Sequence, residues 1–266
     1  MNTRKKKSLI ILFLAILVVS CSKDKTYLSF SEFQKFSISE NLTTDDPHEL
    51  IQKTETLYFT DGELQSGTVK QVIPYYDNYT LECESNLSYT NTVVIMTGCG
   101  GEKATYIVNK EGFAVSCNVE ESGLLRHYEF TYRNEYLCTV TETIDNTETF
   151  RMELFYNKGD LIKTTITRSD ENNTLHFAPT PEKNVSRLPL LYLTEIYPLY
   201  FHKMAIYAGI LGKAPQHLIQ QITQENNVSD TANYSYKFSN EYIISCDIEI
   251  ITGIYKSYRS IKFNYE

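Results

Sequence analysis

The chain has 266 residues, a formal net charge of −8 at pH 7, 21 tyrosines and no tryptophan. Its acidic balance argues against nucleic acid or anionic lipid headgroups as electrostatic partners. The abundance of Thr, Ile, Val, Tyr and Phe favours strands over helices.

The first 21 residues read as a bacterial lipoprotein signal. Arg4–Lys7 form a positive segment, and Leu9–Val19 is an uncharged apolar run that ends in Leu17–Cys21. This run is shorter than the about 20 residues that a spanning helix needs, so we expect cleavage before Cys21 and acylation of its thiol. The alternatives are an ordinary secretory signal or a short anchor helix, with Cys21 incidental.

Three segments follow from this signal. We predict a signal peptide over residues 1–20, a flexible polar tether over 21–48 and a β-hairpin-repeat domain over 49–266. Removing residues 1–20 takes away four positive charges and changes the net charge from −8 to −12. We expect the lipid on Cys21 to hold the protein at the outer membrane, with the cell surface and the periplasmic face both open.

An approximate repeat runs through the predicted domain. Residues that end a strand before a polar turn recur in steps of 24, 25, 24 and 24. Asn, Asp and Gly in these turns suit tight hairpins, and each unit is long enough for one hairpin. The repeated positions are Phe59, Cys83, Val108, Tyr132 and Tyr156, followed by turns at Thr60–Glu63, Glu84–Asn86, Asn109–Gly112, Arg133–Glu135 and Asn157–Asp160, with a later copy at Phe238–Tyr242.

Alternating side chains flank these turns, as half-buried strands require. One face of Tyr128–Tyr132 is aromatic, and Phe150–Tyr156, Tyr242–Ile250 and Ile261–Tyr265 show the same alternation. A single hairpin cannot bury its apolar face, so the units must lie side by side. The predicted fold is mainly β: a single antiparallel meander of repeated hairpins, forming a curved sheet or an open barrel.

The repeat breaks between about residues 172 and 227. Ile196–Leu211 is apolar and predicts one helix that packs on the sheet, covering its apolar face or plugging its open end. Tyr200, Met204, Tyr207 and Leu211 form a stripe at helical spacing. Core packing is the expected role of this stripe, and a ligand groove is the alternative.

Five cysteines remain after Cys21, namely Cys83, Cys99, Cys117, Cys138 and Cys246. An odd number cannot all pair within one chain, and the spacings match no zinc or redox motif. We expect buried free thiols, although an exported protein can form disulfides. Gly98–Gly101 reads as a hairpin turn around Cys99 rather than as a nucleophile site.

No catalytic, cofactor-binding or metal motif is present in the sequence. The five histidines have no metal-ligand spacing, and the carboxylates fall at turns and on polar strand faces. Asp230–Ala232 resembles an O-glycosylation acceptor with Thr231 as the modified residue, and a plain loop is the competing interpretation. The tyrosines indicate core packing, with glycan or peptide binding as the functional alternative.

Three segments of the C-terminal third carry a family resemblance. Ile210–Leu218, Tyr234–Phe238 and Ile261–Tyr265 resemble lipoproteins of Bacteroidota that are grouped as domain of unknown function 4595. The resemblance implies a porin-like fold and brings no catalytic residues. The chain departs from this family at Asn240–Ile243, where a Gly-Tyr-Pro turn is usual.

Three functions stay open from the sequence. The leading hypothesis is a non-enzymatic, lipid-anchored binding or structural component of the cell envelope that takes a glycan, peptide or nonpolar ligand and no nucleic acid. The first alternative is a carrier of a lipid or other nonpolar molecule in a concave sheet. The second alternative is an exported hydrolase whose residues converge only in the fold.

Overall fold

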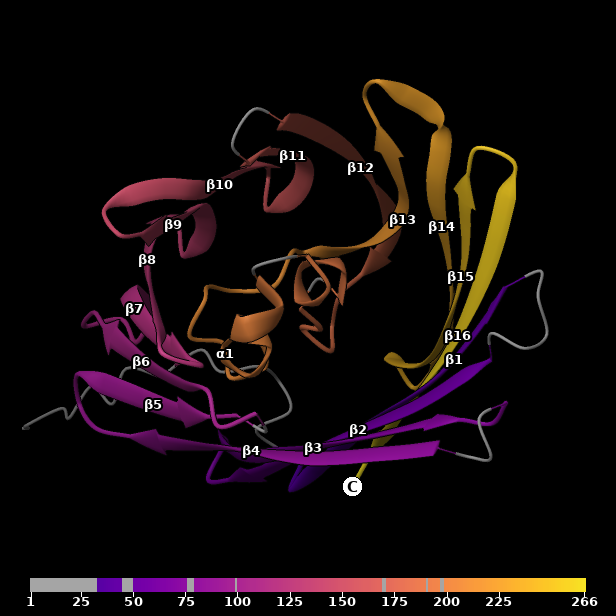
Figure 1. Cartoon of the computed structure of the whole chain (residues 1–266). Helices are drawn as coiled ribbons and strands as arrows, with labels where there is room; N and C mark the ends of the chain where they lie inside the picture. The colour runs from indigo at the N-terminus through magenta and orange to yellow at the C-terminus, as the bar shows by residue number, and fades with distance from the viewer. Residues whose placement is uncertain are drawn as a thin grey trace, which may run out of the picture.

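The computed structural model describes residues 33–44, 50–75, 79–98, 100–168, 171–189, 191–196 and 199–266. These residues form a closed antiparallel barrel of sixteen strands around a central segment (Figure 1). The strands are β1 (Lys35–Thr44), β2 (Ile51–Thr60), β3 (Glu63–Ile73), β4 (Tyr79–Tyr89), β5 (Val93–Thr97), β6 (Lys103–Val108), β7 (Ala114–Glu121), β8 (Leu124–Arg133), β9 (Tyr136–Ile144), β10 (Thr147–Asn157), β11 (Asp160–Arg168), β12 (Glu171–Lys183), β13 (His217–Gln224), β14 (Asn227–Ser239), β15 (Tyr242–Thr252) and β16 (Tyr255–Tyr265).

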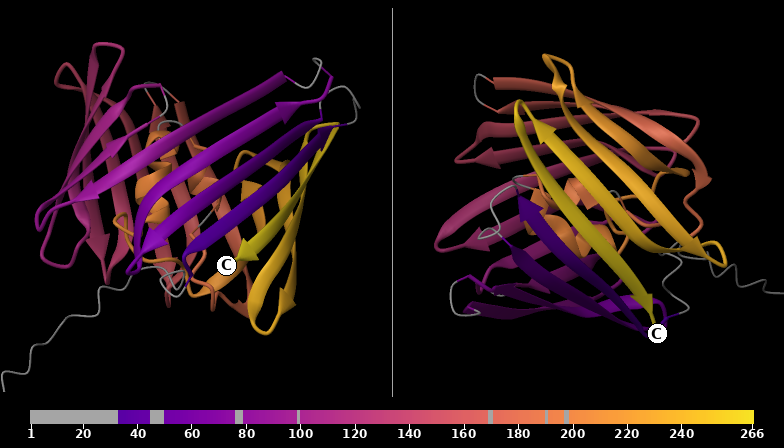
Figure 2. Two further views of the ribbon diagram at one scale, coloured as in Figure 1. Left: turned by 90° about the horizontal axis from the view of Figure 1, so that it is seen from below. Right: turned by 90° about the vertical axis from the view of Figure 1, so that its right-hand side faces the viewer.

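The first and last strands close the barrel. β1 pairs antiparallel with β16 from Phe36 opposite Tyr265 to Thr44 opposite Ser257, and the two strands lie side by side in Figure 2. The barrel is therefore closed, which corrects the predicted curved sheet or open barrel. It also corrects the predicted tether over residues 21–48, because residues 35–44 are a wall strand. Full closure removes every unpaired strand edge.

The hairpins turn at two ends of the barrel, which we name by their position. The N-terminal rim is the end where β1 begins and β16 ends, and the opposite rim is the other end. Tight turns at both rims place two consecutive residues at positive φ, as type I′ turns require. Such pairs are Asp61–Gly62, Asn134–Glu135, Lys158–Gly159 and Asn240–Glu241 at the N-terminal rim, and Ser122–Gly123 and Asp145–Asn146 at the opposite rim.

The predicted hairpin repeat is present along most of the wall. Tyr132 and Tyr156 occupy matching places on β8 and β10, each two residues before a type I′ turn at the N-terminal rim. The ladder register shifts immediately before each of them, at Thr131/Tyr132 and Phe155/Tyr156. The same shift precedes Phe59, Val108 and Phe238. The repeating unit is thus a hairpin that carries one bulge near this rim.

Two details of the repeat are wrong. Glu84–Asn86 is the middle of β4 rather than a turn, because its polar residues lie on an exposed strand. In β15, Ile244 does not share the buried face of Cys246 and Ile248. The register shift at Lys237/Phe238 inverts the alternation at this point, so Ile243 is buried whereas Ile244 is exposed.

The two faces of the wall differ in chemistry. The inner face carries the buried aromatic and aliphatic side chains, such as Tyr128, Phe130 and Met152. The outer face carries charged and polar side chains at mid-height, such as Glu129, Asp247 and Lys262. The hydrophobic core therefore lies inside the barrel.

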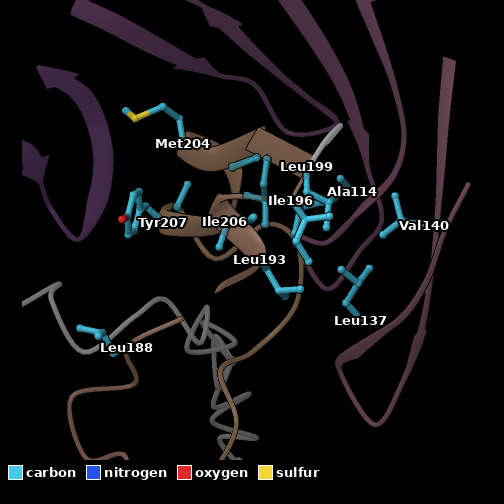
Figure 3. Close-up of a cluster of buried hydrophobic side chains, with 14 of the residues drawn as sticks. Ala114, Leu137, Val140, Leu188, Leu193, Ile196, Leu199, Met204, Ile206 and Tyr207 are labelled. Atoms are coloured by element: carbon cyan, nitrogen blue, oxygen red, sulfur yellow. The ribbon is translucent and has the colours of Figure 1, made fainter. Parts of the chain in front are cut away.

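A segment that we call the plug, residues 184–216 between β12 and β13, fills much of this interior. It contains η3 (Leu191–Thr194), η4 (Leu199–His202) and α1 (Lys203–Tyr207). Figure 3 shows its apolar side chains, among them Leu193 and Leu199, facing Leu137 and Val140 of the wall. Plugging of the barrel agrees with one of the predicted roles for this segment, but the predicted helix is wrong in length, because α1 has only five residues.

In the plug, Met204, Tyr207 and Leu211 of the predicted stripe are buried, whereas Tyr200 is exposed. Core packing is thus confirmed for three of the four residues. Among the described residues, no helix has the length and apolar character needed to cross a membrane.

The returning end of the plug braces the turns of the N-terminal rim. The Ala114 amide donates to the Ile210 carbonyl at 2.8 Å, and the Lys213 amide donates to the Glu135 carbonyl at 3.0 Å. The next hairpin is held by the Gln216 amide, which donates to the Gly159 carbonyl at 3.1 Å. Gly212 lies so close to the wall at φ +95° that a Cβ atom would stand 2.9 Å from the Leu137 amide nitrogen.

Candidate functional site

The candidate site is a cavity of about 350 Å³ between the plug and the inner face of β2–β5. It extends toward the opposite rim, where Glu102 and Glu121 also contribute to its lining. Cavities of a few hundred Å³ are the usual size for small-molecule sites. Its inner lining combines the charged residues Glu55 and Lys203 with Met96, Met204 and Phe201.

Glu55 joins the plug to the wall at this cavity. Its carboxylate accepts from the Lys203 ammonium of α1, lies 2.5 Å from the Lys53 ammonium and is 3.4 Å from the Tyr207 hydroxyl. Burial disfavours the charged form of Glu55, but the charges of Lys203 and Lys53 outweigh burial and lower the pKa of the carboxyl. Glu55 is therefore ionised and already paired.

A second charged contact ties the plug to β1 and β16. The Arg259 guanidinium donates through Nη1 to Glu195 of the plug at 2.6 Å and also contacts Glu40 of β1. Bidentate pairing between a guanidinium and carboxylates fixes orientation as well as distance. The two charged contacts, at Glu55 and Arg259, hold the plug at two places in the lumen.

A third polar cluster lies on β8–β10. The buried Glu142 carboxylate accepts from the Tyr128 hydroxyl at 2.6 Å, the Arg126 guanidinium at 3.0 Å and the Thr149 hydroxyl at 2.7 Å. Arg126 also lies over the Phe201 ring of the plug at 5.5 Å. These contacts satisfy a buried charge, so the cluster is structural.

The buried histidine of the plug is enclosed by aromatic rings. His202 Nδ1 lies 2.9 Å from the Tyr106 hydroxyl, and the His202 ring contacts Tyr128 edge-on at 4.3 Å between centroids. Burial lowers the pKa of His202 to about 3. The imidazole is therefore neutral at physiological pH and serves in packing.

The described cysteines fall into two groups. Cys83, which lines the cavity, is disulfide-bonded, so the expectation of a free thiol is wrong for this residue. Cys117, Cys138 and Cys246 are free, and Cys117 and Cys246 are buried as expected. Burial raises the pKa of the Cys117 thiol and raises that of Cys246 to about 12, so neither is a reactive thiolate.

The residues predicted for covalent modification do not meet at the cavity. Cys21 and Cys99 lie outside the described residues. Thr231 lies in β14 opposite Thr223 and Ile251, so the competing interpretation as a plain loop is wrong. Thr231 alternates with the core-facing Ala232 and Tyr234 and so points outward. Its glycosylation stays a prediction.

The described histidines are dispersed. His127 bonds Asn118, and His217 bonds Asp160 at 3.0 Å. Within the ranges that the structure describes, no group of three or more His, Cys, Asp or Glu side chains could hold a metal ion.

Other cavities have different linings. An apolar cavity between the plug and β13–β14, lined by Leu188, Ile222 and Tyr236 among others, holds only about 30 Å³. Two clefts of about 570 and 640 Å³ open at the N-terminal rim and share Tyr136, Lys213 and Gln216. Sequence reasoning missed all three, because each combines residues of the wall with residues of the plug.

Comparison with known proteins agrees with this architecture. A family model described as domain of unknown function (DUF4595) with porin-like fold matches residues 48–246. A porin-like protein from Bacteroides uniformis is 24% identical, with a TM-score of 0.79 over 89% of this chain and 97% of that chain. A porin-like protein from Bacteroides vulgatus is 12% identical, with a TM-score of 0.55 over 88% of this chain and 98% of that chain. No curated protein matches the chain. The chain therefore belongs to the DUF4595 family, whose fold is porin-like.

Proposed function

We propose that this protein is a non-enzymatic, lipid-anchored binding component of the outer membrane, attached through Cys21. The cavity between the plug and β2–β5 binds a small molecule that has both an apolar body and a polar group. The observation that carries this proposal is the lining of the cavity, where the Glu55–Lys203 pair lies beside Met96 and Met204. A charged pair beside thioether and aromatic side chains suits an amphipathic ligand.

The two faces of the wall support attachment by lipid rather than insertion of the barrel. A membrane-spanning barrel has an apolar outer band and a polar interior, and an Arg or Lys on its lipid face costs about 2–4 kcal/mol at the midplane. Here the interior is apolar, and charged pairs lie on the outer wall among exposed apolar side chains such as Ile107 and Ile162. Arg151 pairs with Glu153 at 3.2 Å on the outer wall, and Lys237 lies 3.8 Å from Asp247. We propose that the barrel stands in water beside the membrane.

The state of the titratable groups supports a binding function over hydrolysis. Glu55 is ionised and paired with two lysines, and His202 is neutral and enclosed. A general acid or base needs a pKa near the working pH and access to substrate. The second alternative, an exported hydrolase, therefore gains no support from these residues.

The first alternative, a carrier of nonpolar ligands, needs a large apolar cavity. The plug occupies the concave apolar face that such a ligand would cover, and the apolar cavity beside β13–β14 holds only about 30 Å³. A water molecule needs about 10–15 Å³ of such space, so this cavity is too small for a lipid chain. Binding at the amphipathic cavity is the better-supported function.

Native mass spectrometry of protein extracted from its own envelope tests ligand binding. We expect a co-purified small molecule in the wild type and at least tenfold lower occupancy in Ser85→Phe, because Ser85 lines the cavity and phenylalanine would fill it. Ser88→Phe is the matched control, since Ser88 is exposed on the same strand. Equal occupancy in both variants, or an empty wild-type protein that binds no member of a diverse small-molecule panel, contradicts the proposal.

Membrane attachment is tested separately with Cys21→Ala. We expect the variant either to be released from membranes or to accumulate with its signal peptide uncleaved. Unchanged maturation together with unchanged membrane retention would refute the lipid anchor, and it would leave the cavity experiment unaffected.

A further inference from the structure

We propose that the cavity between the plug and β2–β5 binds a cationic amphiphile, whose ammonium group lies between Glu102 and Glu121. The apolar body of this ligand lies against Met96 and Met204. The inference rests on the proposed binding function and names the chemical class of its ligand. Three features of the cavity carry it: the balance of charge in its lining, the placement of the two carboxylates, and the aromatic and thioether side chains beside them.

The lining of the cavity carries more negative than positive charge. Its charged residues are three acidic ones and one basic one, namely Glu55, Glu102, Glu121 and Lys203. Glu55 is already paired with Lys203 and, at 2.5 Å, with Lys53. The inner end of the cavity is therefore balanced without a ligand, whereas the end toward the opposite rim has an excess of negative charge.

The two carboxylates of this outer end face the lumen from neighbouring strands. β6 pairs with β7 with Ala104 opposite Val119, and both of these side chains are fully buried. Glu102 and Glu121 come two residues nearer the opposite rim, so the alternation of side chains places them on the same inner face and opposite each other. Like charges that lie opposite each other destabilise a sheet, and a cation between them removes this cost.

Contacts within the protein neutralise these carboxylates only in part. Glu102 accepts from the Gly100 amide at 2.7 Å, which is a donor without charge. Glu121 lies 3.9 Å from the Arg126 guanidinium, whose closer contact, at 3.0 Å, is to the buried Glu142. One guanidinium thus serves two carboxylates, and the ammonium group of a ligand would supply further positive charge.

Aromatic and thioether side chains beside the carboxylates suit an ammonium ion on an apolar body. Tyr200, the exposed residue of the predicted stripe, lines the cavity, and its ring lies 4.1 Å from that of Phe201 between centroids. The face of an aromatic ring attracts a cation that has lost its water. Met96 and Met204 add flexible, polarisable surface for the apolar part of the ligand.

A metal ion is the other cation that two carboxylates suggest. Calcium takes about six to eight oxygen ligands, and the phenyl and thioether groups of this cavity offer it none. In the ranges that the structure describes, no group of three or more His, Cys, Asp or Glu side chains is arranged to hold a metal ion. The lining therefore favours an organic ammonium ion.

Three probes of equal chain length and different charge test this assignment. Decylammonium, decanol and decanoate are titrated into the mature chain, residues 21–266, by calorimetry at pH 7 and below their micellar concentrations. We expect decylammonium to bind at least about tenfold more tightly than either other probe, and Ser85→Phe to abolish its binding. Decanol or decanoate that binds as tightly as decylammonium overturns the inference. If Ser85→Phe blocks that binding, the proposed function stands.

Neutral variants separate the two carboxylates from the overall charge of the protein. Glu102→Gln with Glu121→Gln should weaken decylammonium binding at least about tenfold and leave decanol binding unchanged. The matched control is Glu82→Gln with Glu120→Gln, which removes two carboxylates from exposed positions near the same rim. A cooperative urea transition shows that each variant is folded. Unchanged decylammonium binding in the first variant, or equal weakening in the control, contradicts the proposal.

Calcium chloride tests the competing occupant. We expect it to change the thermal unfolding of the wild type no more than that of Glu102→Gln with Glu121→Gln. Stabilisation by calcium that disappears in this variant would assign the two carboxylates to a metal ion and overturn the proposal. If none of the three decyl probes binds, the inference also fails, and the proposed function then depends on the molecule found by native mass spectrometry.

Discussion

The two halves of the lumen are held together by different forces. Near the N-terminal rim, plug and wall meet through apolar side chains and backbone hydrogen bonds, with Gly212 in contact with the backbone of β9. Toward the opposite rim they meet through ion pairs, at Glu55 with Lys203 and at Glu195 with Arg259. Clefts of about 570 and 640 Å³ open at the rim of the first half, whereas the cavity of about 350 Å³ in the second half lies beside a buried ion pair. The two halves therefore differ in the kind of contact that holds the plug, and substitutions in each half should affect stability differently.

Gly212→Ala should have the largest effect on stability. A residue with a side chain is strained at φ +95°, and its Cβ would lie 2.9 Å from one backbone atom and 3.0 Å from another, neither of which can move freely. We expect the free energy of unfolding in urea to fall by about 4 kcal/mol. Gly123→Ala is the control, because Gly123 has φ +83° and open space around it. Its loss should be about 1 kcal/mol, and equal losses would mean that the bracing contributes nothing.

Glu55→Gln tests the charged half. The substitution leaves Lys203 and Lys53 without their counter-charge in a largely buried place. We expect a loss of about 3 kcal/mol in the free energy of unfolding, measured in the same way. The triple variant Glu55→Met with Lys203→Met and Lys53→Met should regain most of it, since it removes all three charges and burying matched apolar groups is close to neutral. A triple variant as unstable as the single one would indicate that the contact is needed for shape rather than for charge balance.

Acid should destabilise the folded protein through His202, which is buried in the middle of the lumen. Its pKa is about 3 in the folded protein and near 6.5 when unfolded, so between these values the unfolded chain binds a proton that the folded chain does not. The contribution of the neutral His202 side chain to the stability of the folded protein is therefore full above pH 6.5. This contribution decreases as the pH falls from 6.5 toward 3. We expect the free energy of unfolding to drop by about 2 kcal/mol from pH 7 to pH 5. In His202→Gln this part of the pH dependence should vanish, and an unchanged slope would assign it to another group.

The smallest effect is expected at the hairpin repeat. The Tyr132 hydroxyl donates to the Ala114 carbonyl at 2.6 Å, whereas the Tyr156 ring stacks on Tyr136 with centroids 4.8 Å apart. Tyr132→Phe should therefore cost about 1 kcal/mol in thermal or urea unfolding. Tyr156→Phe should cost less, because stacking survives loss of the hydroxyl. A larger loss of stability in Tyr156→Phe than in Tyr132→Phe would contradict the roles given to the two hydroxyls.

Strand content and hairpin spacing followed from the sequence because both are local properties. Alternation in Tyr128–Tyr132 identified an inward aromatic face, and turn residues at fixed spacing located most hairpins at the N-terminal rim. Alternation failed at Ile244, where a bulge shifts the period by one residue. The turn prediction failed at Glu84–Asn86, where polar residues in the middle of β4 resemble a turn in composition.

Closure and the cavity did not follow from the sequence, because both depend on contacts between distant residues. Glu40 makes β1 look like part of a polar tether, yet this carboxylate faces Arg259 of β16 inside the barrel. In the same way, Glu55 and Lys203 look like solvated charges in the sequence and become a pair only when the plug enters the lumen. A hydropathy pattern therefore does not identify those core positions that are occupied by buried ion pairs.

The pairing of β1 with β16 also fixes the order of events in biogenesis. β1 needs β16, which follows it by most of the described chain, as its neighbour, so the barrel cannot close until β16 has been synthesised and exported. Until then, the hydrogen-bonding groups along one side of β1 are open to foreign strands. A product truncated before Tyr255 would keep two unpaired strand edges, one on β1 and one on β15. Premature termination would therefore lead to aggregation rather than to a smaller barrel.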